Sequence, residues 1–186
     1  SDLDEKLPKM IQPKKYLIES QINFNNKLVK VTEENIEECW SYSKVYDREE
    51  FVRDRVFSHY SMWYSINECI RLKELYAHEN KFEYDCVILS RFDISPTTII
   101  NPSEYNLQNF VSGYKKLPRN EVNDWFMMSN NKNMNIVGSL FYFIDYYREN
   151  IINGGGVWTN EAYLRDHLEK FNILVNYFPE INLQYS

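Results

Sequence analysis

The chain has 186 residues, a length typical of one α/β domain that can bury its own core. Hydrophobic residues make up 44% of it and aromatic residues 16%, which excludes a disordered segment. With 27 acidic and 21 basic residues the formal charge is −6, which argues against a dedicated nucleic-acid binder because such a protein carries a basic stripe. No apolar stretch is long enough to span a bilayer, and the charged, polar start lacks a signal peptide pattern.

Three cysteines, Cys39, Cys69 and Cys86, lie far apart and show no CxxC spacing. An odd number without a metal-binding pattern predicts free thiols in a reducing compartment rather than a disulfide framework or a zinc site. We therefore expect a cytoplasmic protein.

In the first half of the chain, residues 15–19 are predicted to form a short strand after Pro13, and residues 21–45 to form mostly loop. From Glu49 to about Asn80 apolar residues recur at steps of three and four, which predicts a long helix. These residues are Phe51, Val52, Val56, Tyr60, Trp63, Ile66 and Ile70.

Residues 84–93 contain an unbroken apolar run of four and end in polar residues, which predicts a central strand buried on both faces. Strands and loops are expected over residues 96–120, and a second buried strand over 124–129. Helices are predicted at 133–150 and 159–170, followed by a last strand at 173–177. Alternating strands and helices indicate an α/β fold with a mixed sheet flanked by helices, in a single domain over residues 1–186.

Arg91 and Asp93 follow the predicted central strand, at the edge where open α/β sheets bind ligands. The Asp93 carboxylate is a hard ligand suited to Mg²⁺ or Mn²⁺, and the Arg91 guanidinium can grip a phosphate. Pairing of both side chains with neighbours at a strand end is the alternative.

Asp124 and Trp125 begin the second buried run. An acid beside a Trp at a sheet edge can bind sugar hydroxyls while the ring covers an apolar sugar face. Equally, Asp124 can cap a turn and Trp125 can belong to the core.

Glu161 lies in the first turn of the last predicted helix, after the natural N-cap Thr159. A carboxylate is stabilised there by the helix dipole, which is one interpretation. The other is a general base that deprotonates an attacking hydroxyl, with residues 154–156, all glycine, giving a mobile loop or a close backbone approach to ligand.

His167 lies on the same helix and is a candidate metal ligand or phosphate contact, although a surface histidine is the more common case. The sequence contains no HExxH, GxGxxG, P-loop or GxSxG pattern. Zinc hydrolysis, a Rossmann or Walker nucleotide site and a serine-hydrolase elbow are therefore unsupported.

The run Tyr84-Asp85-Cys86-Val87-Ile88-Leu89-Ser90-Arg91-Phe92-Asp93 resembles a strand of GT-A-type glycosyltransferases of the polysaccharide and lipopolysaccharide synthesis kind (WavE-like proteins and relatives, including viral ones). Three further motifs of that family have counterparts in the same order: Ser61-Met62-Trp63-Tyr64-Ser65-Ile66, Asn123-Asp124-Trp125-Phe126 and the helix from Glu161 to Leu168. Together they cover roughly residues 13–175.

The resemblance implies a GT-A-like enzyme that moves a sugar from a nucleotide-diphosphate donor to a glycan hydroxyl, in the cytoplasm or, for a viral protein, in the host cytoplasm. It implies a divalent cation held by Asp93 and His167, donor contacts from Arg91, Asp93 and Trp125, and Glu161 and Asp124 as catalytic carboxylates. The family's DxD motif has one acid fewer here. The usual amino-terminal nucleotide-binding strand has no counterpart upstream of Pro13, which implies a truncated or reduced donor site. A non-catalytic glycan-binding or assembly module on the same scaffold is the alternative.

Overall fold

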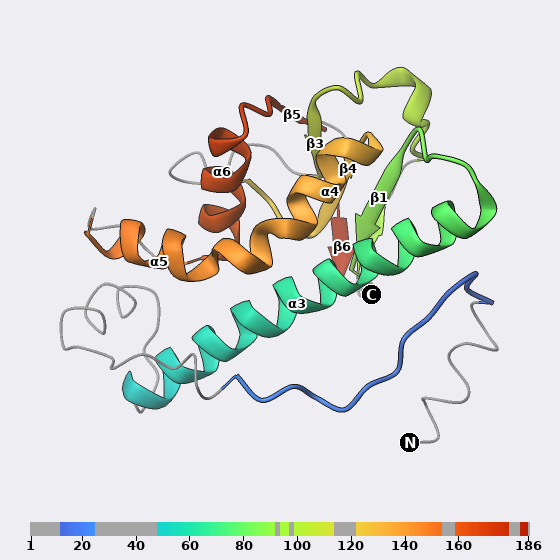
Figure 1. Cartoon of the computed structure of the whole chain (residues 1–186). Coiled ribbons are helices and arrows are strands. Elements are labelled where there is room, and N and C mark those ends of the chain that lie inside the picture. The colour runs from blue at the N-terminus through green and yellow to red at the C-terminus, as the bar shows by residue number, and fades with distance from the viewer. Residues whose placement is uncertain are drawn as a thin grey trace.

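The computed structural model describes residues 12–24, 48–91, 94–96, 99–113, 122–153, 159–178 and 183–185. Its longest element is a 33-residue helix that runs along one side of the molecule (Figure 1). The helices are α3 (Arg48–Asn80), η2 (Pro102–Glu104), α4 (Asn131–Ser139), η4 (Leu140–Phe143), α5 (Ile144–Asn153) and α6 (Asn160–Lys170).

Four strands form a mixed sheet in the order β1-β4-β3-β5, where β3 pairs antiparallel with β4 and parallel with β5. A separate antiparallel pair joins β2 to β6. The strands are β1 (Val87–Ser90), β2 (Ile94–Pro96), β3 (Phe110–Ser112), β4 (Phe126–Ser129), β5 (Val175–Tyr177) and β6 (Leu183–Tyr185). The predicted α/β class with a mixed sheet is thus confirmed.

The expectation of a central, fully buried strand at residues 84–93 is wrong. β1 is an edge strand of the four-stranded sheet, and Ile88 in its middle is 45% exposed. The interior strands are β4 and β3, and every residue of both is buried. An apolar run indicates that a strand will pack against a hydrophobic core, but it does not indicate whether one or two strands will pair with it.

The helix predicted from Glu49 to Asn80 is confirmed as α3, and the one predicted at 159–170 is confirmed as α6. The helical region predicted at 133–150 is interrupted by the short 3₁₀ turn η4. Strand β5 confirms the strand predicted at 173–177, although β6 follows it.

The strand predicted at residues 15–19 is absent, and the segment from 12 to 24 has neither helix nor strand. It runs as an extended chain beside α3 (Figure 1) and contacts that helix through side chains. Lys15 Nζ lies 2.6 Å from Glu79 Oε1, and Tyr64 Oη donates to Glu19 Oε2 at 3.1 Å. The apolar residues that suggested a strand, Tyr16, Leu17 and Ile18, remain exposed.

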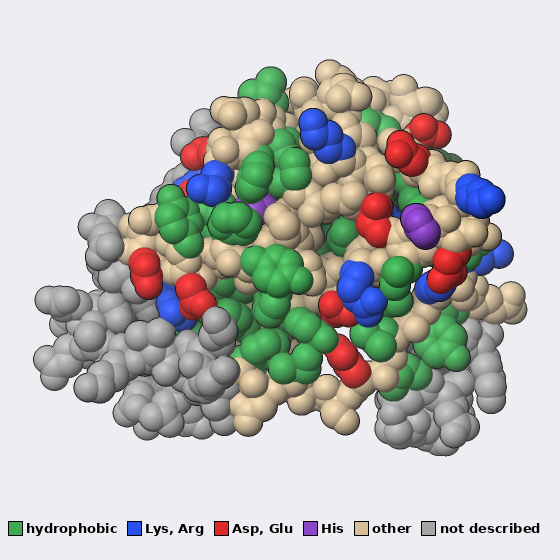
Figure 2. Space-filling model, viewed as in Figure 1, with side chains coloured by type: hydrophobic (Ala, Val, Ile, Leu, Met, Phe, Trp, Pro, Cys, Tyr) green, Lys and Arg blue, Asp and Glu red, His purple; other side chains and the backbone are tan. Residues whose placement is uncertain are grey.

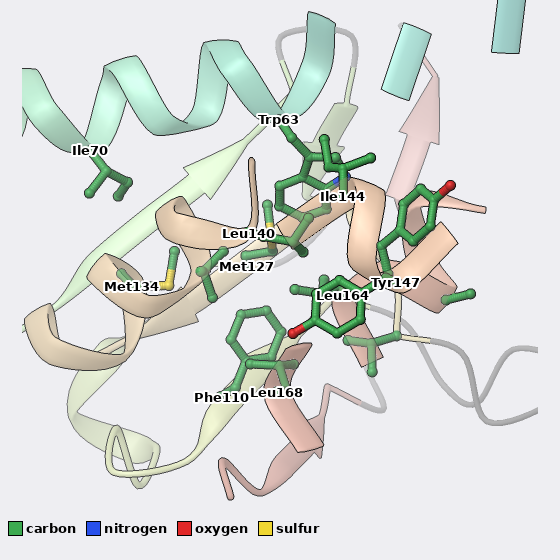
Figure 3. Packing of buried hydrophobic residues seen from close by; sticks show 14 of the residues in the cluster. Trp63, Ile70, Phe110, Met127, Met134, Leu140, Ile144, Tyr147, Leu164 and Leu168 are labelled. Atoms are coloured by element: carbon green, nitrogen blue, oxygen red, sulfur yellow. The ribbon is translucent and has the colours of Figure 1, made fainter. Parts of the chain in front are cut away.

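The main hydrophobic core lies between the helices and one face of the sheet. Trp63 of α3 is fully buried, and Figure 3 shows it beside Ile144 and Leu140. Phe110 and Met127 face this core from β3 and β4. The residues that alternate with them along the two strands, Val111, Phe126 and Met128, pack with Phe178 in a smaller cluster.

The face that carries α3, α4 and α5 shows hydrophobic side chains interspersed with acidic and basic ones (Figure 2). Tyr142 of η4 and Tyr146 of α5 are exposed aromatic residues. In the part of the chain that is described, no helix combines the length and the apolar character needed to cross a membrane.

Candidate functional site

A pocket of about 430 Å³ lies between α3, the end of β1, the turn before β4 and the start of α6; we call it the α3–α6 pocket. Four of the residues singled out in the sequence line it: Arg91, Asp124, Trp125 and Glu161. Helix α3 adds Arg55 and His59, which the sequence had not suggested as site residues. The structure therefore brings together residues that lie up to 106 positions apart in the chain (Arg55 to Glu161).

Antiparallel pairing of β1 with β4 brings Arg91 next to Trp125. Ser90 pairs with Phe126 at the end of the ladder, and just beyond it the Arg91 N–H donates to the Trp125 carbonyl oxygen at 3.2 Å. The Arg91 guanidinium carbon lies 6.0 Å from the centroid of the Trp125 ring, within the range of a cation–π contact. The carboxyl end of β1 and the amino end of β4 thus form one wall of the pocket.

Asp124 is held by a turn that its neighbours stabilise. The Asn123 side-chain oxygen accepts a hydrogen bond from the Trp125 N–H at 2.9 Å, an Asx turn. The Asn123 carbonyl oxygen accepts from Ser112 Oγ at 3.2 Å, and the Val122 N–H donates to the carbonyl oxygen of Glu161 at 3.3 Å. These bonds fix the turn both to the sheet and to the start of α6.

The start of α6 is fixed in turn to α3. Thr159 Oγ1 accepts from the Ala162 N–H at 3.0 Å, which caps the helix as predicted. The Trp63 indole N–H donates to Asn160 Oδ1 at 3.1 Å. Glu161 consequently lies in the first turn of an anchored helix and lines the pocket.

Asp124 is a buried carboxyl group in a site that also holds an acidic neighbour. It is 8% exposed, and its Oδ1 atom is buried without a hydrogen-bond partner. Burial, together with the nearby Glu161 carboxylate, raises the pKa of Asp124 from 3.8 to about 7, although Arg91 opposes the shift. A carboxyl group with such a pKa can gain or lose a proton near neutrality, as a binding or catalytic group requires.

His59 is a pocket residue that sequence reasoning missed. It is 5% exposed, it packs edge-on against Tyr163 with ring centroids 5.3 Å apart, and its Nδ1 atom is buried without a hydrogen-bond partner. Burial, assisted by Arg55 and Arg148, lowers the pKa of His59 to about 3, so the ring is neutral. Its spacing of three residues from Val56 and four from Trp63 places it on the buried stripe of α3, and that signal could have identified it.

His167, expected as a metal ligand, lies in the core and does not line the α3–α6 pocket. Its Nε2 donates to the Ile136 carbonyl oxygen at 2.7 Å, which leaves Nδ1 to accept from Tyr147 Oη at 2.8 Å. Burial lowers the pKa of His167 to about 4. Both ring nitrogens are engaged, so in this structure His167 holds α6 against α4 and α5 and has no nitrogen available to a metal.

Asp93 and residues 154–156 lie outside the described residues, so their predicted roles stay predictions. Within the described ranges, no group of three or more His, Cys, Asp or Glu side chains is arranged to hold a metal ion. Mg²⁺ and Mn²⁺ need only one or two carboxylates when substrate phosphates supply the other oxygens, so a pocket with Asp124 and Glu161 has a compatible donor set.

Comparison of the chain with models of protein families, with curated proteins and with solved structures finds no match.

Proposed function

We propose that this chain is a GT-A-like glycosyltransferase that moves a sugar from a nucleoside-diphosphate donor to a hydroxyl of a growing polysaccharide or glycoprotein glycan. The observation that carries this proposal is the composition of the α3–α6 pocket. Two arginines, two carboxylates and a Trp, drawn from four separate regions of the chain, line one cavity at the edge of the sheet. Such a set matches the chemistry of a substrate with an anionic part and a polyhydroxylated part.

Arg55 and Arg91 are the residues that would bind the diphosphate. A guanidinium group offers planar, charge-assisted hydrogen bonds to phosphate oxygens, and these bonds strengthen as negative charge develops on the leaving group. The pocket supplies this positive charge on the wall where Arg91 contacts Trp125. The half-buried Trp125 ring is suited to cover the apolar face of a sugar.

Glu161 is our choice for the general base. It would take the proton from the acceptor hydroxyl while that oxygen bonds to the anomeric carbon and the bond from that carbon to the diphosphate oxygen breaks. This single displacement inverts the configuration of the sugar. Asp124 would bind the sugar and, through its charge coupling with Glu161, respond to the protonation state of the site.

A divalent cation, when bound, would neutralise part of the charge on the diphosphate. Asp93 is the residue that would hold it, because the resemblance aligns this carboxylate with the family's metal motif. The roles given to Arg55, Arg91 and Glu161 do not depend on that cation.

The test is donor binding and turnover by the full chain. Calorimetry with a panel of nucleoside diphosphate sugars, with Mn²⁺ and again with a chelator, should find one donor that binds and is slowly hydrolysed when no acceptor is present. If no donor binds and none is hydrolysed, the proposal is wrong.

A non-catalytic glycan-binding module is the second candidate. It is favoured by the Trp125 ring beside the Asp124 and Glu161 carboxyl groups, a set that suits a sugar face and its hydroxyls without requiring any reaction. A glycan array separates the two functions, because the module would bind glycans with no nucleotide and no metal present, and nucleotide sugars would not compete.

A further inference from the structure

Strand β1 is an edge strand with the sequence of a strand that has two neighbours. Its residues, Val87–Ser90, form the apolar run that predicted a central strand. Only β4 pairs with it, and β1 lies at the opposite side of the sheet from β5 (Figure 1). Proteins protect a free sheet edge with lysine, proline or a bulge, because such an edge can pair with another chain. Strand β1 has none of these.

The unpaired side of β1 carries the main-chain groups of Ile88 and Ser90. In an antiparallel ladder, residues that exchange hydrogen bonds with the neighbouring strand alternate with residues that do not. Since the Arg91 N–H bonds to the residue before β4, this alternation turns the N–H and C=O groups of Ile88 and Ser90 away from β4. These groups form no hydrogen bond with any described residue, and both residues are exposed. The edge therefore offers donors, acceptors and an apolar side chain to a further strand.

The charges beside this edge match a second copy of the same strand. Asp85 precedes β1, Arg91 follows it, and both are exposed. The Asp85 carboxylate forms no ion pair with any of the residues that the structure describes. If two copies run antiparallel with Ile88 opposite Ile88, Asp85 of each copy lies opposite Arg91 of the other, on the same face of the sheet. The pairing thus places opposite charges together at both ends.

The other register that aligns the outward main-chain groups has Leu89 opposite Leu89. It would place Arg91 opposite the apolar Val87 of the second copy and would leave Ile88 beside a serine. The register centred on Ile88 instead brings the two Ile88 side chains, each 45% exposed, into contact with each other. Both the charges and the apolar surface therefore favour the Ile88-centred register.

We propose that β1 is a self-association edge, through which two copies of this chain pair antiparallel about a two-fold axis at Ile88 and join their four-stranded sheets into one. The interface is isologous, because the same residues face each other in both copies. Asp85 of the second copy then lies beside Arg91, which lines the α3–α6 pocket. A guanidinium group has five N–H donors, so contact with one carboxylate leaves donors for a ligand in that pocket. The proposal does not depend on the proposed function.

The first experiment measures the self-association of the full chain by analytical ultracentrifugation. A single pair of short strands is a small interface, so we expect a monomer–dimer equilibrium with a Kd of about 10–100 μM. Ile88→Lys should raise the Kd about tenfold or more, because two ammonium groups would face each other across the axis. Leu174→Lys is the matched control at the other edge of the sheet, where Leu174 is 70% exposed, and it should associate as the parent chain does.

The second experiment exchanges the charges. Asp85→Arg alone should dimerise more weakly, because two pairs of arginines would face each other, and Arg91→Asp alone should do so because two pairs of aspartates would. An equimolar mixture of the two variants should form a heterodimer, because each arginine then faces an aspartate. Circular dichroism shows that both variants are folded.

The proposal is overturned if the parent chain stays monomeric at about 1 mM. It is equally overturned if Ile88→Lys and Leu174→Lys associate alike, because the contact would then lie elsewhere. A mixture of Asp85→Arg and Arg91→Asp that associates no better than either variant alone would contradict the Ile88-centred register.

Discussion

The main-chain N–H of Arg91 donates a hydrogen bond to the Trp125 carbonyl oxygen at 3.2 Å, one residue beyond the last paired residues of β1 and β4. This bond extends the antiparallel ladder to the wall of the α3–α6 pocket. It brings the Arg91 guanidinium group beside the Trp125 indole ring, one just after the end of β1 and the other just before the start of β4. The edge of the sheet thereby becomes a rigid support for the pocket.

Arg91→Gln should weaken nucleoside diphosphate binding by about tenfold or more, because a charge-assisted bond to phosphate is worth about 1.5–3 kcal/mol. The main-chain bond to Trp125 survives the substitution, so the fold should be preserved. Calorimetry measures the affinity, and Arg71→Gln, an exposed position on α3, is the control. Unchanged diphosphate affinity in Arg91→Gln would place the phosphates elsewhere.

Glu161→Gln should lower turnover by about 10²–10⁴ while donor affinity stays nearly constant, because the amide cannot accept the proton of the acceptor hydroxyl. Stability should fall by only about 0.3–1 kcal/mol, the contribution of a carboxylate in a first helical turn. Transfer or donor hydrolysis is measured beside thermal unfolding. Glu169→Gln, exposed at the other end of α6, is the control. Normal turnover with a slightly lower melting temperature would show that Glu161 only stabilises its helix.

Asp124→Asn should make the protein more stable at about pH 8 by about 1–2 kcal/mol. The pKa of Asp124 is about 7 in the folded chain against an ordinary value of 3.8. Between these values only the folded state keeps the proton, so this group makes stability fall as the pH rises, and above 7 the folded chain buries a charge. The asparagine side chain avoids that cost.

Thermal unfolding of Asp124→Asn against pH, beside that of the exposed Asp85→Asn, tests this relationship. A variant less stable than the parent chain above neutrality would mean that the Asp124 carboxylate makes favourable contacts when charged.

Acidification should destabilise the protein through its buried histidines. The pKa of His167 is about 4 and that of His59 about 3 in the folded chain, against 6.5 ordinarily. As the pH falls below 6.5 the unfolded chain binds protons that the folded chain does not, so stability present above 6.5 is lost toward pH 4. His167 alone should account for up to about 3 kcal/mol.

His167→Gln should be less stable at neutral pH, because Tyr147 Oη loses its acceptor, but its stability should depend less on pH between 6.5 and 4. Replacing the exposed His78 with Gln should leave the pH dependence of the melting temperature as it was. An unchanged pH dependence in His167→Gln would show that this histidine does not resist protonation.

Gly138→Ala should destabilise the protein by about 1–2 kcal/mol even though alanine favours helices. A Cβ atom on Gly138 would lie 3.0 Å from Ile70 Cβ and Cγ1, where α4 crosses α3. These atoms are close to the Ile70 backbone and cannot swing aside.

Denaturant unfolding of Gly138→Ala, Ile70→Ala and the double variant measures the coupling, with Lys132→Ala, exposed on α4, as control. The double variant should lose less stability than the two single losses added together. Additive losses would mean that the two helices separate without strain.

The local elements of this protein follow from its sequence. The apolar spacing of three and four residues along α3 forms a stripe that must be buried, and Thr159 starts α6 because its hydroxyl satisfies a helix-end N–H. Both the stripe and the helix cap are patterns formed by residues close together in the chain. They could therefore be predicted, and four candidate site residues, Arg91, Asp124, Trp125 and Glu161, were found from such local patterns.

Their meeting in one pocket was decided by the tertiary structure. Strand order depends on which strands pair, and the apolar run at 84–93 did not reveal that β1 lies at the edge of the sheet beside β4. His59 became a pocket residue because α3 crosses the start of α6, and His167 became a core residue because α4 and α5 enclose it. The burial of these side chains and the charges around them depend on residues that are distant in the sequence. The sequence therefore supplied the chemical groups, and only the packing of the chain set their environments.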